Sequence, residues 1–287
     1  LSATITVWQS GLGLTDGQVG ILSGALTFAI AAGSLLAGNI TKLFGLICSF
    51  NLMNLMYLIG AAICVLSGNF PVLLAGLIIT GFASGADLPI SLTVISHDAP
   101  NEKVSASLIA STQVFWQIGV LGSYAMAFIV SHVEGAAGAR MVFALLAVLA
   151  GIAFVWRTFS KKFKEFHAAG DEYRAAEGTK TSTEVSFASL FKGTDGKKYV
   201  SFFSCIIIFY VCWNLLANTF GQFQTYILVK ANASQSLATG CGIVLNIVGL
   251  ICGILFASAA GSKHRNKFFY VGIVIQAGAM IGIALGG

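Results

Sequence analysis

One acidic residue, Asp87, falls inside an apolar stretch of the sequence, between residues 71 and 96. Ionisable groups in apolar surroundings are costly and usually functional, and a carboxylate removed from water binds protons more readily. Asp87 lies about 6 Å past the middle of its stretch at the rise of an α-helix. We therefore predict that Asp87 is a proton-coupling residue; the alternative is a structural carboxylate that bridges helices near Pro89.

Amide and aromatic side chains recur at helical spacing in two other apolar stretches. They are Gln113, Trp116, Gln117 and Tyr124 in the first, and Asn214, Asn218, Gly221, Gln222 and Thr225 in the second. Amides donate and accept hydrogen bonds, an indole offers a flat apolar face, and neither stripe can face lipid without losing partners. We predict a substrate-binding set made of Gln113, Trp116, Gln117, Asn214, Asn218 and Gln222. The alternative is hydrogen bonding between helices without a ligand.

The elements that carry these residues are predicted to be membrane helices. Hydrophobic residues make up 56% of the 287 residues and charged residues only 9%, whereas a soluble domain carries about 25% charged residues. The sequence contains no metal-ligand cluster, Ser/His/Asp set or phosphate-binding loop, so we expect no catalytic residue, no metal, no cofactor and no enzyme. The predicted fold is an all-α polytopic transmembrane bundle.

A membrane-crossing helix needs about 20 mostly apolar residues. Eight such stretches are present, at 19–41, 46–67, 71–96, 104–131, 139–157, 199–229, 236–261 and 267–287. Residues 1–18, with Trp8, are expected to form a loop or the tail of a preceding span. Because the chain starts without Met and ends at an apolar run, we expect it to be a fragment.

The basic residues fix the expected orientation. If the spans alternate in direction, fourteen of the 16 lysines and arginines fall on one side, and only Arg140 and Lys230 fall on the other. The richer side is cytoplasmic by the positive-inside rule, which also explains the net charge of +5 without a nucleic-acid partner. We expect a multi-pass protein of the plasma (inner) membrane, in contact with lipids.

A polar stretch divides the spans five and three. We predict an N-terminal helical bundle at 1–157, a central cytoplasmic loop at 158–197, and the start of a C-terminal bundle at 198–287. Charged and aromatic residues alternate near Lys161, so part of the loop is expected to be either an amphipathic surface helix or a solvated linker.

Four short segments resemble the major facilitator superfamily, in its sugar porter and metabolite:proton symporter branch. Residues 38–45 (GNITKLFG) match the spacing of its G-x-x-x-D-R-x-G signature, and residues 81–89 (GFASGADLP) with Pro100 resemble its Gly-rich helix and following motif. Residues 115–119 (FWQIG) and 218–223 (NTFGQF) also resemble that branch. The resemblance covers the whole chain and implies helices two to nine of a twelve-helix fold.

The chain departs from the family pattern at its charged positions. Lys42-Leu43 stand where the signature has Asp-Arg, Leu46-Ile47 replace a basic pair, and His97 replaces an acidic residue. Val104-Ser105 stand where Arg-Gly is expected, and Leu77 replaces an arginine. These departures indicate a variant with rebuilt gating, or a non-transporting relative.

The resemblance implies a secondary transporter that moves a small polar metabolite, such as a sugar or polyol, by alternating access with possible proton symport. Because no Lys or Arg lies mid-span, a neutral, hydroxyl-rich solute is expected rather than an anion. A membrane sensor or receptor that reuses the fold, and a drug:proton antiporter, stay open as alternatives. The solute, the coupling ion, the direction of transport and the oligomeric state do not follow from the sequence.

Overall fold

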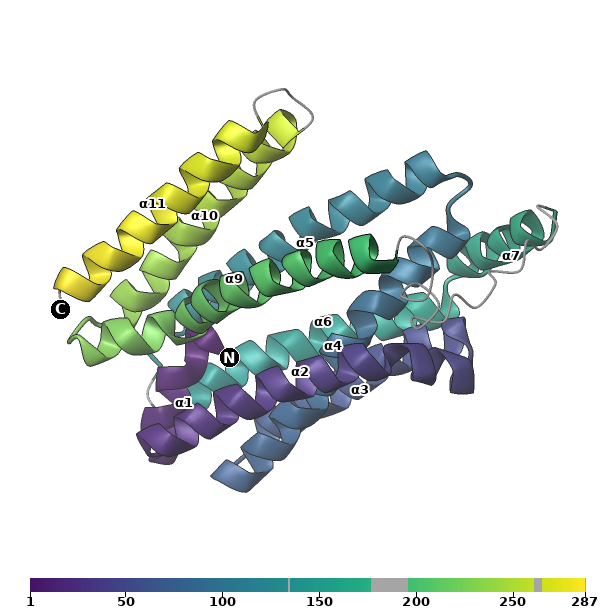
Figure 1. The fold of residues 1–287 in the computed structure, drawn as a ribbon. Helices are drawn as coiled ribbons and strands as arrows, with labels where there is room; N and C mark the ends of the chain where they lie inside the picture. The colour runs from purple at the N-terminus through teal and green to yellow at the C-terminus, as the bar shows by residue number, and fades with distance from the viewer. Residues whose placement is uncertain (134, 177–195, 261–264, 287) are drawn as a thin grey trace.

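The computed structural model describes residues 1–133, 135–176, 196–260 and 265–286, which form helices joined by turns and contain no strand (Figure 1). A 3₁₀ turn at Ser2–Thr4 precedes helices α1 (Ile5–Leu12), α2 (Asp16–Phe44), α3 (Leu46–Leu66), α4 (Phe70–Asp98), α5 (Glu102–Ile129), α6 (Ala137–Phe159), α7 (Lys161–Ala176), α9 (Gly196–Lys230), α10 (Gln235–Ala260) and α11 (Arg265–Gly286). The all-α fold agrees with the prediction.

Each of the eight predicted spans corresponds to one long helix. Within the described residues, α2, α3, α4, α6 and the Gln235–Cys252 part of α10 are long and apolar enough to cross a membrane. The other three, α5, α9 and α11, contain shorter apolar stretches at Val114–Ile129, Val200–Cys212 and Tyr270–Gly282. By length and composition, this is an integral membrane protein with several spans.

Side-chain caps set the first residues of three helices. At the start of α2, Thr15 accepts a hydrogen bond from the backbone N–H of Gln18, while the Gln18 side chain accepts one from the N–H of Thr15. Asn69 and Asn101 cap α4 and α5 in the same way, each through its side-chain oxygen. These caps satisfy N–H groups that a helix leaves unpaired at its first turn.

Helices α2 and α4 touch backbone to backbone. A Cβ built on Gly85 of α4 would lie 2.0 Å from the carbonyl oxygen of Ile30, and one built on Gly33 of α2 would lie 2.1 Å from that of Phe82. Glycine is required at both positions, since any side chain would push the helices apart. Small residues have this role where membrane helices cross closely.

Helix α5 packs against α10 as well as α4, so it connects helices from the first half of the chain to one from the second half. Tyr124 of α5 is buried, and its ring would clash with a Cβ on Gly242 of α10 at 2.2 Å. In Figure 1, α10 and α11 lie side by side, apart from the purple and blue helices α2 and α3.

The first residues form a packed helix, α1, which contradicts the expected loop and leaves the alternative of a span's tail as a prediction. Trp8 of α1 is completely buried, and its ring meets that of Phe143 in α6 edge to face, with 5.9 Å between centres. Burial of an indole is strongly favourable, and this explains why the segment folds back onto the bundle. We call this end of the molecule the Trp8 end.

Part of the predicted central loop is helical, since Lys161–Ala176 forms α7, and its place on a membrane surface stays a prediction. It lies at the end of the molecule opposite α1 (Figure 1), which we call the α7 end, and it packs on α4. The rest of the predicted central loop, 177–195, lies outside the described residues.

Candidate functional site

Asp87 does not stand alone, because it forms an ion pair with Arg157. The Oδ1 atom of Asp87 accepts a hydrogen bond from Nη1 of Arg157 at 2.8 Å. Asp87 lies within α4, whereas Arg157 belongs to the last turn of α6. Their side chains are 27% and 21% exposed, so the pair is largely shielded and electrically neutral as a unit.

Helix α3 holds Arg157 in place between α6 and α4. The guanidinium lies 3.9 Å from the centre of the Phe50 ring and donates a hydrogen bond to the carbonyl oxygen of Phe50 at 3.3 Å. With its amide oxygen turned toward Arg157, Asn54 accepts from Nη1 at 3.0 Å and from Nε at 3.1 Å. Neither Arg157 nor Asn54 was among the functional residues predicted from the sequence.

The candidates on α5 have different surroundings. Trp116 is 63% exposed and Gln117 is half-buried, while the side chain of Gln113 lies outside the described residues. Tyr124, on the same stripe, packs against α10, and its hydroxyl lies 3.1 Å from that of Ser2. The structure therefore assigns Tyr124 to packing and leaves the indole of Trp116 open to contact.

Two of the α9 candidates bond to each other along their own helix. Asn214 donates to the carbonyl oxygen of Tyr210 at 2.8 Å, and Asn218 donates to the side-chain oxygen of Asn214. Amides four residues apart on a helix commonly pair in this way. Asn218 is exposed and Asn214 is half-buried, so both remain reachable from outside the helix.

Gln222, the third α9 candidate, lines a cavity against α2. The cavity has a volume of about 470 Å³ and is lined by Gly20, Ser23, Gly24, Thr27, Phe28, Ala31, Gln222 and Phe223. Thr27 donates a hydrogen bond to the side-chain oxygen of Gln222 at 3.2 Å. Ser23 is only 2% exposed, and its hydroxyl has no partner among the described residues.

This α2–α9 cavity combines features that suit a hydroxylated solute. It offers hydroxyl and amide groups, which donate and accept hydrogen bonds, beside the phenyl rings of Phe28 and Phe223. An added Cβ on Gly20 or Gly24 would meet nothing within 4 Å, so both glycines border open space. Sequence reasoning missed Ser23 and Thr27, although Gly20, Ser23, Gly24 and Thr27 recur at helical spacing.

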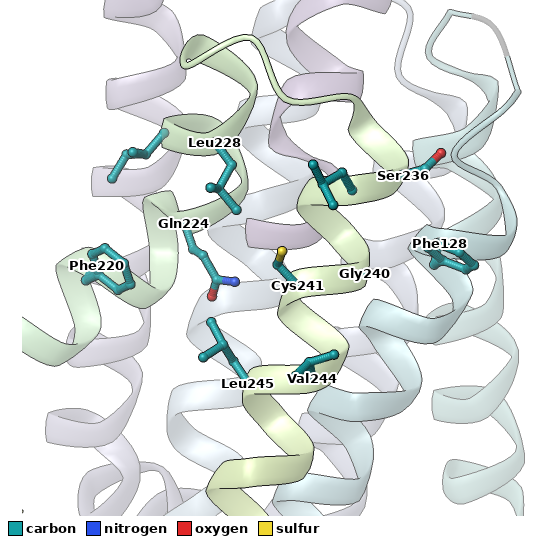
Figure 2. Close-up of a pocket in the computed structure, with 11 residues that line it drawn as sticks. Phe128, Phe220, Gln224, Leu228, Ser236, Gly240, Cys241, Val244 and Leu245 are labelled. Atoms are coloured by element: carbon teal, nitrogen blue, oxygen red, sulfur yellow. The ribbon is translucent and has the colours of Figure 1, made fainter. Parts of the chain in front are cut away.

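A larger cavity of about 830 Å³ lies between α5, α9 and α10 and is almost wholly apolar. Figure 2 shows the Gln224 side chain among Leu228, Cys241 and Leu245. The amide nitrogen of Gln224 is buried without a partner among the described residues. The described side chains of the six predicted binding residues do not line this cavity, whose apolar walls do not suit a hydroxylated solute.

Polar contacts join the two predicted bundles at the Trp8 end. Thr6 donates to the side-chain oxygen of Gln235 at 2.6 Å, which ties α1 to α10. Lys230 at the end of α9 lies 3.1 Å from Oδ1 of Asp16 at the start of α2. The bundles are thus held together at this end, one to two helical turns beyond the α2–α9 cavity.

Comparison with known proteins agrees with this architecture. The chain is 30% identical over 276 residues to the Minor myo-inositol transporter IolF of Bacillus subtilis (strain 168), covering 93% of this chain and 61% of that protein. It is 26% identical over 153 residues to the D-xylose-proton symporter-like 2 of Arabidopsis thaliana, covering 52% of this chain and 30% of that protein. The chain thus spans less than two thirds of the length of these relatives.

A solved structure shares the fold. It is a partially occluded inward open conformation of the xylose transporter XylE from E. coli, with a TM-score of 0.65 and 15% sequence identity, covering 91% of this chain and 68% of that chain. The sequence profile of the Major Facilitator Superfamily matches residues 1–287. With the whole chain matched by this profile, the protein belongs to the Major Facilitator Superfamily.

Proposed function

We propose that the protein is a secondary transporter that moves a small, neutral, hydroxyl-rich solute, such as a sugar or polyol, by alternating access. The observation that carries the proposal is the α2–α9 cavity, where Thr27 meets Gln222 and the hydroxyl of Ser23 lies buried with no partner among the described residues. The two relatives described above, a minor myo-inositol transporter and a D-xylose-proton symporter-like protein, support this substrate class.

The charges in the bundle favour a neutral solute. Arg157 is neutralised by Asp87 and further held by Asn54, so it is not free to compensate an anion. An unpaired anion within the membrane would be expensive. Gln117, Trp116, Asn214 and Asn218 belong to the same proposal as further solute contacts, together with Gln113.

We place the α7 end in the cytoplasm, on the plasma or inner membrane, because the basic residues cluster on that side. In this orientation the Trp8-end contacts between Thr6 and Gln235 and between Asp16 and Lys230 close the outer side. Residues 1–157 and 198–287 then act as two bundles that rock about the site, and 158–197 connects them.

In this proposal, a proton and the guanidinium of Arg157 compete for the carboxylate of Asp87. Protonation neutralises the carboxylate and removes its attraction for the guanidinium, which keeps its contacts with Phe50 and Asn54. The α4–α6 connection would therefore loosen when a proton binds and tighten when it leaves. Such a pair can link proton binding to the relative positions of helices.

The test is uptake of labelled myo-inositol and xylose by the complete gene product in liposomes. Gln222→Leu should raise KM for the transported solute about tenfold, the cost of one or two lost hydrogen bonds. Gln276→Leu, the same substitution on α11 away from both cavities, should leave KM unchanged. Binding without accumulation or exchange would point instead to a sensor, and equal effects of the two variants would remove Gln222 from the site.

A further inference from the structure

Four titratable side chains form a cluster where α7 rests on the end of α4. His97 and Asp98 are the last residues of α4, and His167 and Asp171 belong to α7. The Nδ1 atom of His167 lies 2.5 Å from Oδ2 of Asp98. His97 lies between two carboxylates, with Nδ1 2.9 Å from Oδ1 of Asp98 and Nε2 3.2 Å from Oδ1 of Asp171.

The contacts of His97 with two carboxylates favour a proton on each ring nitrogen. Its Nδ1 atom hydrogen-bonds to Asp98, which takes one N–H of the imidazole. Its Nε2 atom forms an ion pair with Asp171, and the doubly protonated imidazolium supplies the positive charge of that pair. When His97 loses one proton, the ion pair with Asp171, which is 76% exposed, loses its attraction.

His167 needs no additional proton for its contact. Its Nδ1–H can donate to Asp98, and its Nε2 atom is buried without a partner among the described residues, which suits the neutral tautomer. The nearby charge on α6 is Arg157, which stacks on Phe50 of α3, and the ring of His167 meets that same phenyl ring at 6.4 Å. A positive charge on His167 would leave its second N–H without a carboxylate among the described residues, whereas each ring nitrogen of His97 faces one. The extra proton therefore belongs to His97.

The backbone of α7 approaches α4 closely at Gly170. A Cβ added to Gly170 would lie 3.0 Å from Nδ1 of His97, 3.0 Å from its carbonyl oxygen and 3.1 Å from Oδ1 of Asp98. These distances are tighter than ordinary van der Waals contacts, so an alanine would require α7 or its neighbours on α4 to shift by a few tenths of an ångström. Gly170 thus allows the four side chains to meet.

We propose that His97, Asp98, His167 and Asp171 form a proton-operated latch, which holds α7 on α4 when His97 is doubly protonated and loosens it when His97 is neutral. Because the docked state binds the extra proton, docking is favoured at low pH and weakened as the pH rises. Histidine is the side chain that changes charge between about pH 5 and pH 8. Contacts of Phe163 and His167 with Phe50 persist in either state, so release is partial.

The latch acts at the point where the first bundle leads into the connection to α9. Helix α7 follows α6 after the single residue Ser160, so its docking fixes the direction of the chain leaving α6. When α7 loosens at higher pH, its docking no longer fixes the direction of the chain after α6. This property belongs to the α4–α7 contact and does not depend on which solute is carried.

Hydrogen–deuterium exchange of the complete gene product in detergent tests the latch. Protection of the α7 backbone amides, corrected for the intrinsic effect of pH, should fall by up to about fivefold between about pH 5.5 and about pH 8.5, the worth of an exposed ion pair. His97→Gln should show the low protection at both pH values. His132→Gln, the same substitution at the Trp8 end, should retain the step.

Gly170→Ala separates docking from helix formation. Alanine favours an isolated helix over glycine, yet it should lower α7 protection at both pH values because its methyl group crowds the contact with His97 and Asp98. Protection of α7 that is independent of pH in the unaltered protein would overturn the proposal. So would a pH step that survives His97→Gln, or α7 protection that is unchanged or higher in Gly170→Ala.

Discussion

Asp87 and Arg157 lie on helices that share no extensive contact, yet their charged atoms are 2.8 Å apart. The guanidinium reaches Asp87 by passing along α3, where it stacks on Phe50 and bonds to Asn54. The pair therefore connects three helices near the α7 end through one side chain. Its strength depends on the protonation of Asp87, which makes it both a structural link and a candidate coupling element.

The first prediction concerns the energy of this pair. Asp87→Asn and Arg157→Gln should each lower the free energy of unfolding by about 2 kcal/mol, because each leaves a largely buried charge without its partner. The double variant should cost less than the two single costs added together, since neither charge then remains. Denaturation in mixed micelles measures the three values. Simple additivity would mean that the pair makes no energetic contribution of its own.

The second prediction concerns coupling. Asp87→Asn keeps the size of the side chain and its ability to accept a hydrogen bond from Arg157, but it cannot be ionised. The variant should lose proton-driven accumulation of solute and keep exchange of solute down a gradient. Transport assays in liposomes with and without an imposed pH gradient measure both modes.

Thr93→Val, on the exposed face of the same helix, is the matched control and should keep both modes. If Asp87 is only structural, Asp87→Asn will reduce accumulation and exchange equally. Concentrative uptake that is unchanged between about pH 5 and about pH 8 would rule out coupling through this residue.

The third prediction concerns the α2–α4 contact. Gly85→Ala should destabilise the protein by about 1–3 kcal/mol, because the new methyl group overlaps the carbonyl of Ile30 and the helices must separate. Gly38→Ala, on α2, is the control, since an added Cβ there meets nothing within 4 Å. It should be neutral or slightly stabilising. Thermal unfolding in detergent compares them, and equal melting temperatures would contradict the close approach.

The positions of the helices could be predicted from hydropathy, but their exact ends could not. The span predicted at 46–67 corresponds closely to α3 (Leu46–Leu66), whereas the span predicted at 19–41 is shorter than α2 (Asp16–Phe44). The extra turn of α2 contains polar residues, and it is helical because Thr15 and Gln18 cap each other. A count of apolar residues does not detect such caps.

The sequence could predict which helix faces carry the candidate residues, but not which side chains those residues contact. Helical spacing correctly grouped Asn214, Asn218 and Gln222, yet two of these bond to each other and only Gln222 reaches the α2–α9 cavity. The partner of Asp87 was missed for another reason. Arg157 lies at the end of a span, and its reach to Asp87 depends on where α3 lies between α6 and α4.

The last prediction concerns the closed Trp8 end. Thr6→Val removes the hydroxyl that donates to Gln235 at 2.6 Å and leaves that amide oxygen without this donor. Thr6 is 8% exposed, so the loss should cost the closed arrangement about 1 kcal/mol. The population open at the Trp8 end should then rise about fivefold.

Labelling of a cysteine in the α2–α9 cavity, introduced by Thr27→Cys, measures this opening with an impermeant thiol reagent added outside. The labelling of the native cysteines, measured in the protein that keeps Thr27, is subtracted. Thr41→Val is the matched control, because the Thr41 hydroxyl donates within its own helix, to the carbonyl oxygen of Gly38, at the α7 end. Faster labelling with Thr6→Val but not with Thr41→Val would support a gate at the Trp8 end, whereas equal labelling rates would show that the Thr6–Gln235 bond does not control access to the cavity.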